Sequence, residues 1–257
     1  MEQQLLLDSR QIEGFERDGF LVVRGVFDAT EVDEMKAAFE RLEAQAEGLD
    51  GKVMNNGSQF VCETQPDGRT RIHRIVWCGG AEPLLLDYGR DPRLLALVSQ
   101  LTGARQFDQL INQAHFKRPG DAVTFEWHQD SIHRRYGTEL WTDVDGRGSF
   151  IETTTAIDPM TEDNGPLQFI PGSHTGGHIE PDPQTGELPS GAYDPDDAVT
   201  LTMAPGDVAL FGPFTIHGSG PNESDMPRRL FLNGYALPGA NRRDYPGDGA
   251  GRRVEIP

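Results

Sequence analysis

Apolar residues in the first part of the chain recur at helical spacing. Val32, Met35, Phe39 and Leu42 fall on one face of a helix that we expect to begin near Ala29. This stripe is expected to pack against a β-sheet and to form part of the core. Helix starts are also predicted where aspartate is followed by a capping partner or by proline: Asp8 with Gln11, Asp28 with Glu31, and Asp91 with Pro92.

From Gln106 onward the pattern changes to short apolar runs separated by turn residues. The expected strands are 107–117, 123–128, 149–157, 167–170, 199–203, 207–211, 214–217 and 230–236. Turn signals at Pro119-Gly120 and Asn164-Gly165 predict that the first two strands form one antiparallel hairpin and the next two another. About eight antiparallel strands with regular turns indicate a jelly-roll barrel of two facing sheets.

The predicted fold is therefore mainly β with flanking α-helices. We expect residues 1–257 to form one domain, because barrels and sandwiches of this size are commonly undivided. Residues 1–105 would supply helices and short supporting strands, 106–237 the jelly-roll core and 238–257 an irregular tail. Residues 55–67 are predicted as a mobile loop with a possible strand at 60–61. The segment 175–198, rich in Pro, Gly and Asp, is expected to be a surface excursion.

The charge of the chain narrows its partners. It carries 41 acidic and 23 basic residues, a formal net charge of −18. Such a chain is not expected to bind nucleic acid, because that binding depends on Lys and Arg neutralising phosphates. The charge also disfavours strongly anionic substrates, unless a local basic pocket overcomes the global field. We expect a cytoplasmic protein without membrane contact, because the amino terminus lacks the features of a signal peptide and no apolar run is long enough to span a bilayer.

The segment His128-Gln129-Asp130 has the composition of half a metal site. In a strand, alternate side chains share a face, so His128 and Asp130 would point the same way. One imidazole and one carboxylate are two of the three ligands in the facial triad that holds non-haem Fe(II). His217, where a short apolar strand enters a polar turn, is the expected third ligand. A rival motif, His178-Ile179-Glu180, lies in the excursion, where rigid geometry is not expected.

A possible anion anchor follows His217. Arg228 comes eleven positions later, at the start of the last strand, and its guanidinium can bind a carboxylate through two hydrogen bonds. Ser219, two residues after His217, can donate to the same carboxylate. This set suits a diacid whose near end reaches the metal.

Taken together, these segments resemble the phytanoyl-CoA dioxygenase family of Fe(II)/2-oxoglutarate-dependent oxygenases, which includes ectoine hydroxylases. The resemblance extends over nearly the whole chain. The matching segments are 15–26, Trp127-His128-Gln129-Asp130, Asn164-Gly165-Pro166-Leu167, Pro171-Gly172-Ser173-His174, Pro205-Gly206-Asp207, and His217-Gly218-Ser219-Gly220-Pro221-Asn222 with Arg228.

The resemblance implies a double-stranded β-helix (cupin-like) fold, with Fe(II) held by His128, Asp130 and His217. It implies that 2-oxoglutarate and dioxygen are cosubstrates, and that Arg228 and Ser219 hold the distal carboxylate of 2-oxoglutarate. Asn112 occupies a position where some relatives place an amide that touches this cosubstrate. The implied reaction is hydroxylation of an unactivated C–H bond, with release of succinate and carbon dioxide. Retention of Asp130 disfavours halogenation, which needs that position open.

Residues that contact a substrate are expected in the loops around the metal. His73 and His133 are each flanked by arginine, in segments that could close over the metal. Arg135, Tyr136 and Trp141 lie in the segment that directly follows the metal motif. We expect a small molecule, such as an amino acid, osmolyte or natural-product intermediate, rather than a CoA thioester.

Two other functional classes stay open at this point. The chain could be a catalytically silent jelly-roll protein that binds a metal and a small ligand. It could also be a metal-dependent isomerase or hydrolase on a similar barrel, which would need no diacid anchor. Formation of succinate from 2-oxoglutarate in the presence of Fe(II) separates both from the oxygenase.

Overall fold

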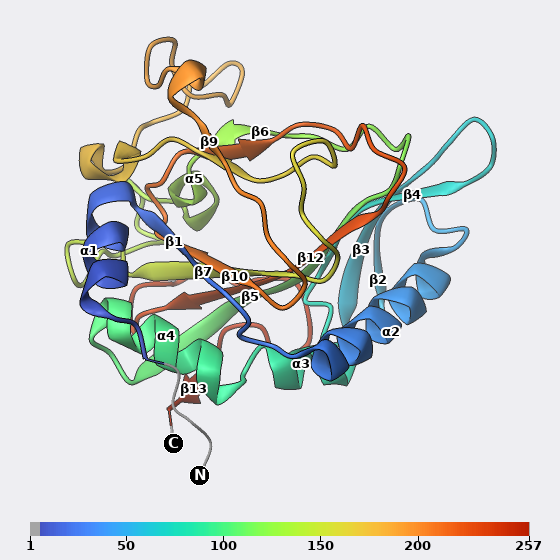
Figure 1. Ribbon diagram of the computed structural model, residues 1–257, viewed down its shortest axis with the longest axis horizontal. Helices are drawn as coiled ribbons and strands as arrows, with labels where there is room; N and C mark the ends of the chain where they lie inside the picture. Colours follow the sequence, from blue (N-terminus) through green and yellow to red (C-terminus); the bar gives the residue numbers. More distant parts are fainter. Residues whose placement is uncertain (1–5, 257) are drawn as a thin grey trace.

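Two antiparallel sheets face each other in the computed structural model, which describes residues 6–256 (Figure 1). The larger sheet contains β1 (Phe20–Val23), β2 (Gly51–Asn55), β3 (Ser58–Thr64), β4 (Thr70–Val76), β5 (Gln106–Lys117), β7 (Phe150–Ala156), β10 (Val208–Phe211), β12 (Arg228–Ala236) and β13 (Arg252–Glu255). The smaller sheet contains β6 (Phe125–His128), β8 (Gln168–Phe169), β9 (Val199–Thr200) and β11 (His217–Ser219).

The sheet order confirms the jelly roll. Strands β5, β7, β10 and β12 lie together in the larger sheet, in the order β10-β7-β12-β5, and the smaller sheet has the order β6-β11-β8-β9. The chain therefore passes repeatedly between the two sheets, as expected for a double-stranded β-helix. Strand β1 extends the larger sheet beside β10, and β4, β3 and β2 extend it beside β5.

Helices cover the outer face of the larger sheet. They are α1 (Ser9–Asp18), α2 (Ala29–Ala46), α3 (Pro83–Tyr88) and α4 (Pro92–Thr102). The short helix α5 (Asp130–Arg134) and the 3-10 turns at Ser173–Gly176 and Pro195–Asp197 lie on the side of the smaller sheet. The predicted starts of α1 and α2 are confirmed, because Asp8 and Asp28 each form a complete capping box.

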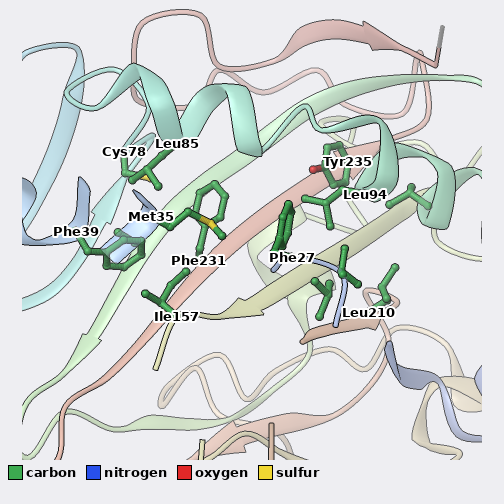
Figure 2. Close-up of a cluster of buried hydrophobic side chains, with 14 of the residues drawn as sticks. Phe27, Met35, Phe39, Cys78, Leu85, Leu94, Ile157, Leu210, Phe231 and Tyr235 are labelled. Carbon is green, nitrogen blue, oxygen red and sulfur yellow. The ribbon is translucent and has the colours of Figure 1, made fainter. Parts of the chain in front are cut away.

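The apolar face of α2 forms much of the main core. Val32, Met35, Phe39 and Leu42 are buried, as the helical spacing predicts. In Figure 2, Met35 and Phe39 lie beside Phe231 of β12. Because this core lies between the helices and the larger sheet, the opposite face of the sheet is left for the space between the two sheets.

Both predicted hairpins are wrong. β5 and β6 lie in different sheets, and so do β7 and β8. β6 pairs with β11, whereas β7 pairs with β10 and β12. The turn residues do reverse the chain at these points, but in a jelly roll the reversal carries it across to the facing sheet.

Two segments predicted as irregular contain strands. Residues 55–67 contain β3, which includes the possible strand at 60–61, and β3 forms a hairpin with β2. The turn is Asn56-Gly57, with both φ values positive, at 47° and 77°. Asn-Gly is a strong signal for such a turn, so the prediction of a loop here was wrong. The expected tail contains β13, which pairs with β5. The segment 175–198 is a surface excursion, as expected (Figure 1).

Among residues 6–256, no helix has both the length and the apolar character needed to cross a membrane.

Candidate active site

His128 and His217 face each other across neighbouring strands of the smaller sheet. They are register partners in β6 and β11, and their ring centroids are 4.3 Å apart. Each ring donates from Nδ1 to a backbone carbonyl of its own segment, at 2.6 Å for His128 to Glu126 O and 3.0 Å for His217 to Thr215 O. Because these carbonyls can only accept, both Nε2 atoms keep a lone pair available for a metal.

Asp130 joins this pair from the start of α5. The prediction that His128 and Asp130 alternate along one strand is wrong, because β6 ends at His128 and Asp130 is the first residue of the helix. The two side chains still converge, with His128 Nε2 3.9 Å from Asp130 Oδ1. Between them Gln129 is fully buried, donating to Gly177 O and Phe214 O and accepting from Ile179 N. This amide fixes the bend that brings Asp130 beside His128.

The electrostatics keep the ligand atoms in the forms that bind metal. Burial would raise the pKa of Asp130, but the fields of His217, Arg134 and His128 hold it below its ordinary value. Burial, and then the neighbouring His128, lowers the pKa of His217 to about 4. At neutral pH the group therefore offers one carboxylate and neutral imidazole.

His133 is a second possible partner for His128 and Asp130. The ligand atoms of these three residues lie within 4.8 Å of one another, and His133 is exposed. His217 is the better candidate for the third ligand. It is buried, a backbone carbonyl orients its ring, and β6 pairs with its strand. The rival His178 instead contacts Ser131 Oγ through Nδ1, at 2.7 Å.

A buried cationic group lies near this cluster. Arg228 is 1% exposed and donates from Nη2 to Gly165 O at 2.7 Å, while its Nε has no hydrogen-bond partner among residues 6–256. Burial lowers the pKa of Arg228 to about 9, so the guanidinium stays charged at neutral pH. An anionic ligand would compensate this buried charge.

Lys117, which was not predicted as a site residue, lies behind this anchor. Its amine donates to Ser219 Oγ at 2.6 Å, to Ser219 O at 3.1 Å and to Gly220 O. Because Ser219 Oγ accepts from the amine, its own proton is available for another acceptor. In the sequence, Lys117 is only a lysine at the end of the predicted strand 107–117, and its role depends on the pairing of β5 with β12.

These groups share one cavity between the two sheets. It has a volume of about 320 Å³, and its lining includes His128, Asp130, His217, Ser219 and Arg228. It is large enough for 2-oxoglutarate and one small molecule rather than for a macromolecule. Thr154 also lines it, with a buried hydroxyl that has no partner among the described residues.

Asn112 does not reach this cavity. Its amide donates to Leu85 O and Asn233 Oδ1 and accepts from Gly79 N, all on the helix-covered side of β5. The neighbouring Gln113 lines the cavity instead. The prediction for Asn112 therefore fails through strand register, because adjacent residues of a strand face opposite sides.

Among the predicted substrate contacts, His133 alone lines the cavity. His73 faces Glu63 at 3.4 Å, while Arg74 beside it lines the cavity. Arg135 is exposed at the end of α5, and the cavity residue is Arg134. Tyr136 and Trp141 pack on each other within an apolar cluster, with ring centroids 5.3 Å apart.

The carboxy-terminal segment supplies a wall that the sequence analysis did not predict. Arg243, Tyr245 and Pro246 line the cavity. Arg243 donates to His133 O at 2.9 Å, and its guanidinium lies 5.2 Å from the ring centroid of Tyr245. Residues 238–257 have no periodic pattern of apolar residues, so a contribution to the cavity wall was not predicted from the sequence.

The arrangement fits an iron ion with a bound diacid. Asp130 Oδ2 and Arg228 Nε are buried without partners among residues 6–256, and both belong to residues that line the cavity. Two imidazoles and one carboxylate on a jelly roll are the donor set of non-haem Fe(II) oxygenases, which leaves coordination positions for other molecules. Fold and site thus define the class of Fe(II)/2-oxoglutarate-dependent oxygenases.

The chain belongs to the phytanoyl-CoA dioxygenase (PhyH) family, whose model matches residues 15–230. It is 28% identical to an ectoine dioxygenase of Bordetella parapertussis over an alignment of 241 residues. The alignment covers 86% of this chain and 73% of the relative. The iron-bound structure of EctD from S. alaskensis superposes with a TM-score of 0.70 at 26% identity, over 93% of this chain and 80% of that one.

A further solved structure supports the fold. EvdO2 from Micromonospora carbonacea, complexed with 2-oxoglutarate, superposes with a TM-score of 0.70 at 24% identity, over 96% of this chain and 98% of that one. Taken with the family match, the chain is a non-haem Fe(II)/2-oxoglutarate-dependent dioxygenase, with dioxygen as the other cosubstrate.

Proposed function

We propose that the enzyme hydroxylates an unactivated C–H bond of a small molecule and converts 2-oxoglutarate to succinate and carbon dioxide in the same turnover. The observation that carries this proposal is that His128, Asp130 and His217 share a cavity with a buried guanidinium that has no acidic partner among residues 6–256. A hydrolase or isomerase on this barrel would have no use for that guanidinium.

His128, Asp130 and His217 would hold Fe(II) on the face of the smaller sheet. Bound there, the iron supplies the oxidising chemistry that couples dioxygen to the substrate C–H bond. Glu152 also lies by this group. Burial, and then Asp130, raise its pKa well above the ordinary value, which favours the neutral carboxyl.

Arg228 and Ser219 would bind the distal carboxylate of 2-oxoglutarate. Arg228 offers its unpartnered Nε, and Ser219 offers the hydroxyl proton that Lys117 leaves free. Arg228 on β12 and Ser219 on β11 are held by hydrogen bonds to Gly165 O and from Lys117 before the ligand arrives, which lowers the ordering cost of binding. The ligand would then extend from Arg228 toward the iron ligands, and Gln113 and Thr154 line the same space.

The test is the consumption of 2-oxoglutarate by the purified protein. With Fe(II), dioxygen and 2-oxoglutarate, we expect slow formation of succinate even without a substrate, faster when an accepted substrate is added. Formation should stop when either iron or oxygen is withheld. A protein that binds 2-oxoglutarate but forms no succinate with any small-molecule library would be the silent alternative. Turnover of a substrate without oxygen and 2-oxoglutarate would establish the isomerase or hydrolase.

A further inference from the structure

The cavity is basic although the protein is acidic. Its lining includes Lys52, Arg74, Arg134, Arg228 and Arg243, whereas its carboxyl groups are those of Asp130 and Glu152. Five basic side chains therefore share the cavity with two carboxyl groups. The site therefore concentrates positive charge inside a chain of net charge −18.

The cosubstrate and the metal account for part of this charge. In the loaded site, the two charges of Fe(II) and the charge of Arg228 would be balanced by Asp130 and the 2-oxoglutarate dianion. Arg134 has its own surroundings, because its guanidinium lies 4.9 Å from the ring centroid of Phe150 and 5.2 Å from that of Tyr245. Lys52, Arg74 and Arg243 remain, and none of them forms an ion pair with an acidic side chain among residues 6–256.

Arg74 is the clearest case. It is half-buried on the cavity face of β4, and among residues 6–256 no acidic side chain forms an ion pair with it. Arg71 on the same strand is instead paired, with Nη1 3.1 Å from Glu63 Oε2. Burial without compensation disfavours a charged group, and it lowers the pKa of Arg74. A partly desolvated arginine with free donors is suited to bind an anion.

Strand β5 lies between Arg74 on β4 and Arg228 on β12. Arg74 pairs with His115 across β4 and β5, and His115 lies two positions before Lys117, the partner of Arg228. The ring of His115 stacks on Phe125, with centroids 4.8 Å apart, and both line the cavity. His133 and Arg243 also line the cavity, and Arg243 donates to His133 O.

We propose that the substrate carries a carboxylate and that Arg74 binds it, with Arg243 adding positive charge at the rim. The inference rests on the proposed function, because it assigns 2-oxoglutarate to Arg228. It names Arg74 as the residue that selects small carboxylates, such as amino acids, over neutral molecules of the same size. The guanidinium fork matches the two oxygens of a carboxylate, and an amide presents one acceptor and two donors instead.

The experiment measures binding of matched carboxylate and amide probes under nitrogen, where turnover cannot proceed. The protein is loaded with Fe(II) and saturated with 2-oxoglutarate, so that Arg228 is occupied. Acetate against acetamide, benzoate against benzamide, and L-proline against L-prolinamide are then titrated by calorimetry. We expect at least one carboxylate to bind at least about tenfold more tightly than its amide, since a hydrogen bond to a charged group contributes about 1.5–3 kcal/mol.

Arg74→Gln should reduce this preference to less than about threefold without changing the affinity for 2-oxoglutarate. Arg71→Gln is the matched control, because Arg71 is on the same strand but pairs with Glu63, and it should keep the wild-type preference. The inference is overturned if no carboxylate binds, if amides bind equally well, or if Arg74→Gln keeps the preference. Failure of 2-oxoglutarate to bind in the first titration would instead count against the proposed function.

Discussion

Lys117 and Arg228 are direct register partners across β5 and β12, and both are buried. Neither forms an ion pair with an acidic side chain among residues 6–256. Burial, followed by the charge of Arg228, lowers the pKa of Lys117 to about 6. At neutral pH the guanidinium of Arg228 is therefore charged and the amine of Lys117 is mostly neutral. A dianion bound beside them would favour the protonated amine.

Binding of 2-oxoglutarate at neutral pH should take up close to one proton. Without ligand, the Lys117 amine is mostly neutral above pH 6. A dianion bound beside Arg228 would raise the pKa of Lys117. The affinity for 2-oxoglutarate should be constant below the pKa that Lys117 has in the ligand-free protein. Above it, the affinity should fall by up to about tenfold per pH unit, until the pH reaches the higher pKa of Lys117 in the complex. Calorimetry in two buffers with different ionisation enthalpies measures the uptake.

Lys117→Met is the control for this effect, because it leaves Arg228 in place while removing the titrating amine. It should bind 2-oxoglutarate without proton uptake and with a flat pH dependence. Uptake that persists in the variant would assign the proton to another group.

Asp130→Ala should abolish succinate formation and weaken Fe(II) binding. Two neutral imidazoles would remain to hold the ion, without the charge that draws a hard cation into the site. Metal content after dialysis and succinate yield are the two measurements. Glu126→Ala is the matched control, since Glu126 is exposed on the neighbouring strand β6 and contributes to the site through its backbone carbonyl. Wild-type metal content in Asp130→Ala would move the iron to other ligands.

Arg228→Met should raise the 2-oxoglutarate concentration needed for half-maximal succinate formation by at least about tenfold, because a charged pair of hydrogen bonds is lost. Fe(II) binding should be little affected, which separates the anchor from the metal ligands. Arg253→Met, at an exposed arginine 2.6 Å from Asp108, is a suitable comparison. An unchanged requirement would place the cosubstrate elsewhere in the cavity.

Asn112 and Gln113 allow a test with adjacent residues. Asn112→Ala removes buried hydrogen bonds to Gly79, Leu85 and Asn233, so it should lower the free energy of unfolding by about 2–4 kcal/mol with little change in 2-oxoglutarate binding. Gln113→Ala should weaken 2-oxoglutarate binding, with little change in the free energy of unfolding. Urea unfolding and 2-oxoglutarate titration of both variants measure the two effects, and equal behaviour would contradict the register.

Local features of this fold could be predicted from the sequence, whereas the pairing of strands could not. The motif around His128 and the segment from His217 to Arg228 were identifiable because their residue types are rare in combination. The helix caps at Asp8 and Asp28 were local signals, and they were correct. Partner choice between strands was not local, so the predicted hairpins failed although their turns exist.

The residues around the motif failed in a consistent way. Asn112, His73 and Arg135 were each predicted to line the site, and in each case the adjacent residue does so: Gln113, Arg74 and Arg134. A one-residue error reverses the face in a strand and rotates the side chain by about a quarter turn or more in a helix. Sequence alone located the correct segments but could not fix their phase, which β-bulges and short helices alter.

The smaller sheet has consequences for how the enzyme acquires its metal. Its strands are four, three, two and two residues long, whereas β5 and β12 in the larger sheet have twelve and nine. Few backbone hydrogen bonds therefore join the segments that carry His128 and His217. Ion binding joins them directly, and coordination energy of this kind adds to folding stability. In the apoprotein, amide hydrogens of β6 and β11 should exchange with solvent earlier than those of β5 and β12, and iron should slow that exchange selectively.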